Sequence, residues 1–197
     1  MADVFVRSYP SPEYNKKEIL RYAGVEGDAP ELDGILSECI REARDRLIYK
    51  VCYAEFPIIR QGDALDLGFS SVSSKALQKN LEGCDKIILF AATVGIDIDR
   101  LIAKYSVTSP SKALMFQAVG AERIESLCDI FCEDIARGRA FRPRFSAGYG
   151  DLPIELQMDI FRALDCSRKI GLTLNESLLM SPTKSVTAIV GVKEDKI

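Results

Sequence analysis

A continuous apolar run at residues 86–94 constrains the fold of this chain more than any other feature. It holds Ile87, Ile88, Leu89, Phe90, Ala91, Ala92 and Thr93, and Gly95 ends it. An unbroken apolar run of this length fits a strand that is buried on both faces. Residues 185–192 predict a second buried strand. Neither run is bounded by edge-type prolines, so we expect both in one sheet.

A long helix should cover one face of that sheet. Ser109 is a helix cap, and Pro110 follows it at the first helical position. The helix that they open is expected to reach about Ala136. Its predicted buried stripe consists of Leu114, Ala118, Ala121, Leu127, Cys128, Phe131 and Ile135.

The other segments alternate between helical and strand patterns. Asn15 has capping-box spacing and opens a short helix that Gly24 ends, and a second helix follows Pro30. Further helices are expected at residues 74–81, 97–105 and 153–164. Strands are expected at 51–59 and 64–69, joined by a hairpin turn at 60–63. The predicted class is α+β: a mixed sheet with a covering helix at 49–197, preceded by an arm and helical extension at 1–48.

Composition excludes several classes of function. A net charge of -3 argues against nucleic acid as the main partner. No apolar run approaches the roughly 18 residues of a membrane span, and no signal-peptide pattern is present, so a cytoplasmic protein is expected. The six cysteines form no C-x-x-C pair and the chain has no histidine. We therefore expect no metal site and no histidine-dependent catalytic residue.

Two clusters of charged residues lie along the second half of the long helix and just beyond its end. Glu122, Glu125, Asp129 and Glu133 recur at helical spacing. Taken alone they indicate a solvated acidic face, with Glu133 paired to Arg137. Arg137, Arg139, Arg142 and Arg144 indicate solvated cations near a helix C-terminus, and a phosphate or RNA patch is the alternative.

The loop that starts at Arg144 carries the most distinctive chemistry. Residues 144–153 read RFSAGYGDLP, so Arg144 and Tyr149 bracket a short loop in which Gly148 lets backbone approach a ligand. One fixed cation, one amphipathic ring and free backbone amides suit a small zwitterion with an aromatic ring. Without a ligand, Tyr149 would be a core residue with its hydroxyl hydrogen-bonded.

This loop, with the segment LNESLLMSP at residues 174–182, resembles the activation domain of cobalamin-dependent methionine synthase. The shared features are R-x-x-x-G-Y, a proline a few residues on, and an L-T-E-S-x-x-M-x-P-like entry to a strand. The resemblance implies an S-adenosylmethionine site at Arg144, Ser146, Gly148 and Tyr149, with Ser146 acting through its backbone. Matching the family helix to residues 126–133 adds Glu133. The connection from Glu133 to Arg144 is shorter than in the family. The family also holds the ligand with an aspartate from its N-terminal region, and residues 1–60 contain no counterpart of that segment.

The same resemblance implies a function. It suggests reductive reactivation in trans of a separate methionine synthase that carries cobalamin, with a flavodoxin-type electron donor, because 197 residues leave no room for the other modules. The alternative is a docking or stabilising partner of a corrinoid protein, with weak or lost S-adenosylmethionine binding. A cobalamin-independent methyltransferase lacks a recognisable glycine motif.

Overall fold

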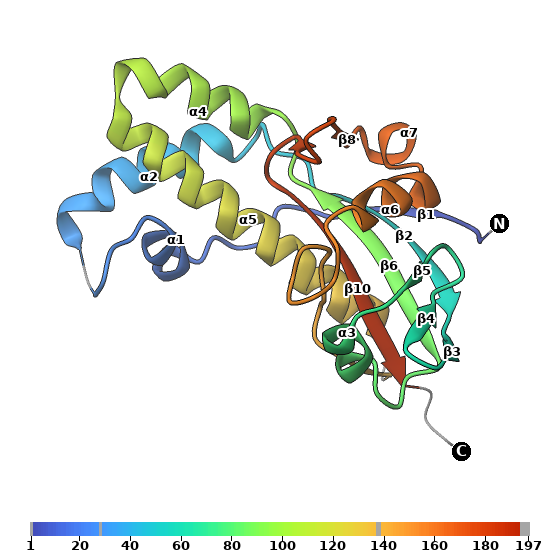
Figure 1. Cartoon of the computed structure of the whole chain (residues 1–197). Coiled ribbons are helices and arrows are strands. Elements are labelled where there is room, and N and C mark those ends of the chain that lie inside the picture. The colour runs from blue at the N-terminus through green and yellow to red at the C-terminus, as the bar shows by residue number, and fades with distance from the viewer. Residues whose placement is uncertain (1, 28, 137–138, 194–197) are drawn as a thin grey trace.

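An antiparallel sheet of five strands forms the centre of the molecule (Figure 1). The computed structural model describes residues 2–27, 29–136 and 139–193. The strand order is β1-β2-β6-β10-β7, with bounds β1 (Phe5–Ser8), β2 (Lys50–Pro57), β6 (Lys86–Thr93), β10 (Ser185–Lys193) and β7 (Ala140–Phe141). The two apolar runs are the neighbouring strands β6 and β10, as the sequence predicts.

The α+β class is confirmed, but the strand pairs of the described residues are antiparallel where a mixed sheet was expected. The connection from β2 to β6 explains the difference. Pro57, at the end of β2, pairs with Lys86, at the start of β6, so the chain leaves and re-enters the sheet at the same end. A parallel pair would need a crossover to the opposite end.

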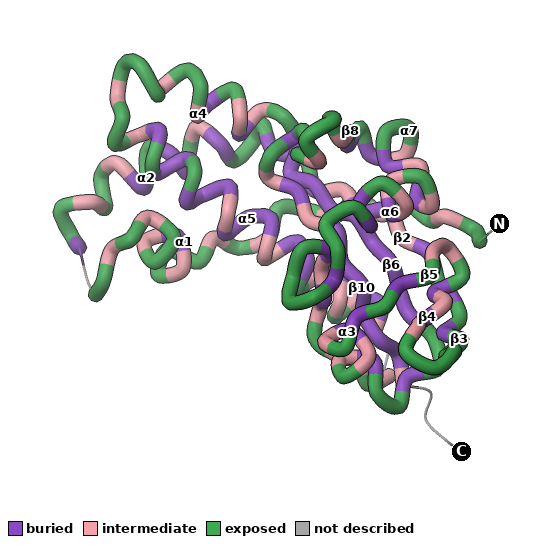
Figure 2. Tube along the Cα trace, viewed as in Figure 1, coloured by how far each residue is buried: buried purple, intermediate pink, exposed green. Residues whose placement is uncertain are grey.

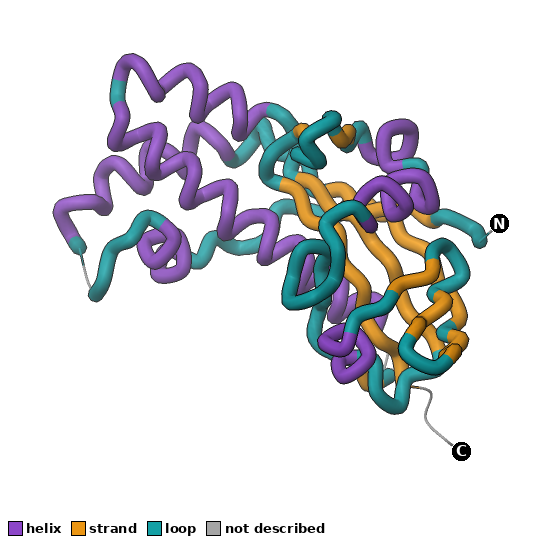
Figure 3. Tube along the Cα trace, viewed as in Figure 1, coloured by secondary structure: helices purple, strands orange, loops and turns teal. Residues whose placement is uncertain are grey.

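Helices and short hairpins enclose both faces of the sheet (Figure 3). One face packs on α1 (Lys16–Tyr22), α2 (Asp33–Ala43), α4 (Asp97–Thr108) and α5 (Pro110–Ala136), with a 3-10 turn at Pro30–Leu32. The other face packs on α3 (Lys75–Asn80), α6 (Leu156–Leu164) and α7 (Cys166–Ile170). The small sheets are β3 (Ile59–Gln61), β4 (Ala64–Asp66) and β5 (Ser71–Val72), and β8 (Thr173–Leu174) with β9 (Met180–Ser181).

Strand β6 is buried on both faces, because each face packs against a different hydrophobic core (Figure 2). Ile88 and Phe90 belong to the core beneath α5, whereas Ile87 and Leu89 belong to the core beneath α6 and α7. Side chains of a strand point alternately to opposite faces. The continuous apolar run therefore supplies both cores at once.

The predicted stripe of α5 is correct in its second half and wrong at its start. Leu127 and Phe131 are fully buried, but Leu114 is 54% exposed. The first turns of α5 extend beyond the sheet and pack against α4, which lies to the left in Figure 1. Contact with α4 therefore determines which residues of those turns are buried, and these include Phe116 and Val119 but not Leu114.

The N-terminal segment contributes a strand to the main sheet and two helices to the group that covers one of its faces. β1 pairs with β2 in the main sheet, and α1 and α2 pack on α5. Asn15 caps α1 by accepting a hydrogen bond from the Glu18 amide, as its spacing predicts. The division into an arm and helical extension at residues 1–48 and an α+β domain at 49–197 stays a prediction, and these contacts join the two parts.

Candidate functional site

The loop after β7 is hydrogen-bonded to β10, the neighbour of β7 in the sheet. The Arg142 amide donates to Gly191 O at 2.9 Å, and Phe145 and Ile189 exchange two backbone hydrogen bonds of 2.9 and 2.8 Å. Ser146 Oγ donates to Thr187 O at 2.8 Å. The Arg144 side chain therefore extends from a stretch of backbone that is hydrogen-bonded to the sheet.

The turn at Gly148 is closed by its own backbone. Gly148 has φ of 85°, and its amide donates to Leu152 O, while the Tyr149 amide donates to Ser146 O. The free amides expected at these two positions are thus already used. A Cβ on Gly148 would lie 2.9 Å from Ile154 Cδ1, so both φ and space favour glycine.

Asp151 fixes the far end of the loop. Its carboxylate accepts hydrogen bonds from Ser74 Oγ and from the amides of Lys75, at 2.7 Å, and Ala76, at 3.2 Å. These are the unpaired donors of the first turn of α3. The Ser74 hydroxyl, followed by the two amides, holds the pKa of Asp151 below its usual range.

Arg144 lies against the acidic face of α5. Its Nη2 donates to Glu125 Oε2 at 2.8 Å, and its Nη1 lies 2.9 Å from Asp129 Oδ1. The Arg144 side chain is 27% exposed, and the two carboxylate side chains are 42% and 66% exposed. Nη1 is buried but makes no contact of hydrogen-bonding geometry in the part of the chain that the structure describes. Burial opposes the charge of Arg144, yet the neighbouring thiols and carboxylates give it a net raised pKa.

Glu133 lies one turn beyond Asp129 on α5 and is exposed. Within residues 2–27, 29–136 and 139–193, no hydrogen bond or ion pair joins Glu133 to Arg144. Its expected alternative partner, Arg137, falls outside the described residues. The loop thus brings Arg144 to Glu125 and Asp129, and a role for Glu133 stays a prediction.

Tyr149 is 68% exposed, so the interpretation of this ring as a core residue is wrong. The ring stands edge-on to buried Phe145, with centroids 5.3 Å apart and planes at 86°. Phe145 belongs to the core beneath α6 and α7. An exposed ring supported by a buried one offers a rigid aromatic face to a ligand or partner.

A shallow hollow of about 310 Å³ adjoins Arg144. It is lined by Asp129, Cys132, Phe141, Arg142, Pro143, Arg144 and Val190. Burial raises the pKa of the Cys132 thiol, although Arg144 opposes this rise. The thiol that lines the hollow is therefore uncharged at pH 7. Glu133 and Tyr149 lie outside this lining.

The acidic face of α5 is not uniformly solvated, because Glu122 is buried. It binds Arg123, with Arg123 Nε donating to Glu122 Oε2 at 2.6 Å. Arg123 also donates to the carbonyls of Pro12 and Glu13, each at 2.6 Å. Apolar residues on all sides of this helix segment indicate that the segment is buried. The neighbouring sequence does not indicate that residues 12–15 supply the hydrogen-bond partners of Glu122 and Arg123.

Arg139 and Arg142 of the basic cluster also bind other parts of the protein. Arg139 pairs with Glu55 at 3.4 Å, and Arg142 Nη2 donates to Glu82 O at 2.5 Å. Arg137 lies outside the described residues. Arg144 differs from these two in pairing with two carboxylates, those of Glu125 and Asp129, beside the hollow.

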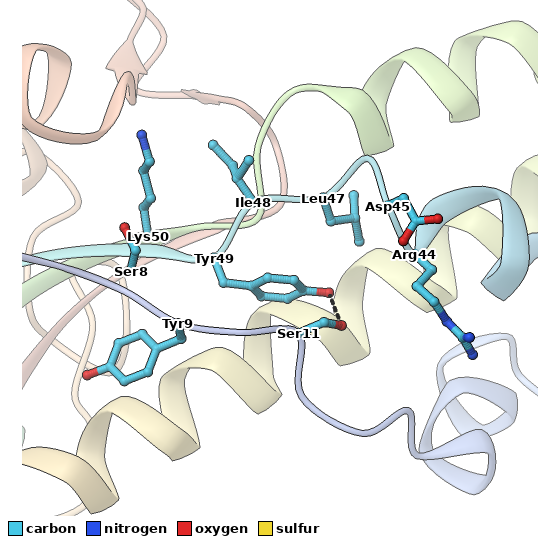
Figure 4. Close-up of a pocket in the computed structure, with 9 residues that line it drawn as sticks. All are labelled: Ser8, Tyr9, Ser11, Arg44, Asp45, Leu47, Ile48, Tyr49 and Lys50. Atoms are coloured by element: carbon cyan, nitrogen blue, oxygen red, sulfur yellow. Dashed lines mark hydrogen bonds between the residues drawn. The ribbon is translucent and has the colours of Figure 1, made fainter.

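Another hollow, of about 360 Å³, lies at the start of β2, away from the loop (Figure 4). Ser11 and Tyr49 both line it, and Ser11 Oγ donates to the Tyr49 hydroxyl at 3.2 Å. Arg44 and Lys50 extend away from this pair in the close-up. The hollow contains none of the residues that the sequence predicts for a site.

In the described residues, acidic and cysteine side chains form no group suited to a metal ion. The same residues include no helix long and apolar enough to cross a membrane.

Comparison with known proteins bears on the fold. No protein-family model matches the sequence, and no curated protein matches it. A crystal structure of the MetH reactivation domain bound to AdoHcy is similar over 100% of this chain and 80% of that chain, with a TM-score of 0.70 and 16% identity. The chain has the fold of the MetH reactivation domain. At this identity the likeness confirms the expected architecture and leaves the ligand and partner to be proposed.

Proposed function

We propose that this protein binds S-adenosylmethionine and holds it for the reductive remethylation of cobalamin on a separate methionine synthase chain. The observation that carries the proposal is Arg144, a half-buried guanidinium with an unsatisfied N–H, in the fold of a domain that binds AdoHcy. The planar fork of an arginine can hold a carboxylate with two hydrogen bonds. The amino-acid end of S-adenosylmethionine supplies such a carboxylate.

The partners of Arg144 are weak enough to be exchanged. Ion pairs between exposed groups typically stabilise by no more than about 1 kcal/mol. A buried charge-assisted hydrogen bond to a ligand contributes about 1.5–3 kcal/mol. A ligand carboxylate can therefore replace Glu125 or Asp129 as the partner of Arg144.

The other predicted residues complete the binding site. Gly148 allows close approach of backbone, Tyr149 offers its exposed ring or hydroxyl, and Ser146 holds the loop on β10. Glu133 adds negative charge near the ammonium group or sulfonium. Bound S-adenosylmethionine brings an activated methyl group, so these residues need only bind and orient it. No acid or base from the chain is required.

The partner supplies the remaining chemistry. It carries the cobalamin, and a flavodoxin-type protein or another low-potential donor provides one electron. The methyl group passes to the reduced cobalt and S-adenosylhomocysteine remains. This protein is thus one component of a methyltransferase whose other groups lie on the partner chain.

Calorimetric titration with S-adenosylmethionine tests the site. Arg144→Ala should weaken binding roughly 10- to 150-fold, from the loss of one charge-assisted interaction. Arg100→Ala is the matched control, because Arg100 is an exposed arginine on α4 with a single carboxylate partner. Equal affinity of the two variants would refute the site.

A spectroscopic assay tests the reaction. A methionine synthase without its activation domain, given this protein, S-adenosylmethionine and a low-potential reductant, should convert cob(II)alamin to methylcobalamin. The alternative function, docking without methyl transfer, is favoured by the existing pairing of Arg144 with two α5 carboxylates. A spectrum that stays cob(II) while S-adenosylmethionine binds would select that alternative.

A further inference from the structure

The edge strand β1 exposes its outer side. It is the terminal strand of the main sheet and pairs with β2 alone among the described strands. Phe5 and Val6 are 53% and 44% exposed. At the opposite edge, β7 is very short and the Arg142–Phe145 segment covers part of β10. β1 is therefore the longer open edge.

Hydrogen bonding to β2 determines which groups of β1 point outward. The Tyr9 amide donates to Tyr49 O at 2.9 Å, so Tyr9 turns its backbone groups toward β2. In an antiparallel pair this orientation recurs at every second residue. Phe5 and Arg7 therefore also face β2, and Val4, Val6 and Ser8 present their N–H and C=O groups outward.

We propose that β1 is a self-association edge that pairs antiparallel with β1 of a second copy of this chain, in a register centred on Phe5. In this register Val4 lies opposite Val6 of the second copy, and Val6 opposite Val4. Both residues have outward backbone groups, so the register forms four hydrogen bonds. Phe5 then faces Phe5 at a non-hydrogen-bonded position, where side chains are closest.

Charge selects both the partner and the register. Asp3 and Arg7 lie at equal distances on either side of Phe5, so the proposed pairing places each Asp3 opposite an Arg7. Arg7 uses Nη1 on Asp134 and Nε on the Tyr53 hydroxyl, which leaves its Nη2 for Asp3 of the second copy. A register centred on Val6 would instead place Phe5 opposite Arg7. Edge charges usually discourage pairing, but here they are complementary across the proposed pairing of two β1 strands.

The dimer leaves the candidate ligand site open. Arg144 and the 144–151 loop follow β7, at the edge of the sheet opposite β1. Two copies joined at β1 would form a continuous sheet with the two loops at its far ends. The inference does not depend on the proposed function.

Sedimentation equilibrium tests the association. We expect the wild-type chain to dimerise reversibly and Asp3→Lys to raise the dissociation constant roughly tenfold or more, because two attractive pairs become repulsive. Asp63→Lys is the matched control, since Asp63 is exposed in the β3–β4 turn and the charge change is the same. Val6→Pro removes two of the four hydrogen bonds without removing a β2 contact and should weaken the dimer similarly. A wild-type chain that remains monomeric up to about 1 mM would overturn the proposal.

Cross-linking tests the register. Phe5→Cys places two thiols at a non-hydrogen-bonded pair, with a Cα separation of about 4.5 Å that a disulfide can span. Oxidised glutathione should convert the two thiols to an intermolecular disulfide and is itself reduced to two glutathione molecules. Val6→Cys and the wild type, with its own six cysteines, are the controls. Dimers that cross-link through Val6→Cys and not through Phe5→Cys would refute the register.

Discussion

Two arginine–carboxylate clusters on α5 use the same chemistry in opposite surroundings. Arg123 and Glu122 have side chains 0% and 3% exposed, and the guanidinium also binds two carbonyls and the Tyr14 ring, 3.9 Å away. Arg144 is partly exposed, its carboxylate partners more so, and it keeps an unsatisfied N–H. The first cluster fixes the N-terminal segment on α5, and the second can be opened. The two arginines therefore differ in how far their partners are buried, and the ligand that we propose for Arg144 would replace only partly exposed partners.

The largest effect should come from breaking the buried cluster. Arg123→Met leaves the Glu122 carboxylate buried without a cation and should lower the free energy of unfolding by about 3–5 kcal/mol. Urea denaturation measures this. Glu122→Gln combined with Arg123→Met should recover part of the loss, because the stranded charge is removed. A single variant within about 1 kcal/mol of wild type would show that the cluster is not structural.

The exposed cluster should behave in the opposite way. Arg144→Ala should change the free energy of unfolding by less than about 1 kcal/mol, because its ion pairs are solvated. The same variant should lose most of its S-adenosylmethionine affinity. A large loss of stability with unchanged affinity would place Arg144 with Arg123 as a structural residue.

Removing the competitors of the ligand should produce a smaller gain. Glu125→Gln or Asp129→Asn releases one interaction of Arg144, and affinity for the ligand carboxylate should rise by up to about fivefold. Glu133→Gln should weaken binding instead, because the proposed role of Glu133 is to face the ligand's positive charge. Titration of the three variants side by side distinguishes the carboxylates that hold Arg144 from the one that contacts the ligand. Weakening in all three would mean that the whole face contacts the ligand.

The smallest effect concerns Asp151, whose carboxylate is exposed yet bound to backbone amides. Its folded-state pKa lies below the unfolded value of about 3.9. Its contribution to stability is therefore present above that value and is lost as the pH falls through the folded pKa. The unfolding midpoint of Asp151→Asn, followed from pH 4 downward, should depend less on pH than that of the wild type. Parallel curves would show that ionisation of Asp151 does not stabilise the fold.

The sequence predicts the frame of this molecule better than its side-chain pairs. The apolar runs of β6 and β10 and the cap at Ser109–Pro110 are local signals, and the structure contains the elements that they predict. The helical repeat does not show where a helix extends beyond the sheet, so it predicts burial for Leu114, which is exposed. The burial of Glu122 depends on residues 12–15, more than a hundred positions away. The pairing of Arg144 with Glu125 likewise depends on how the loop returns to α5.

The attachment of the 144–151 loop at both ends has a thermodynamic consequence. Its start is part of a β-bridge at Phe145, and its end is held by the amides of α3 at Asp151. The entropy of closing this segment is thus lost when the chain folds and not when a ligand arrives. Binding should therefore order little backbone, and amide exchange at Phe145 and Ile189 should be slow before any ligand is added.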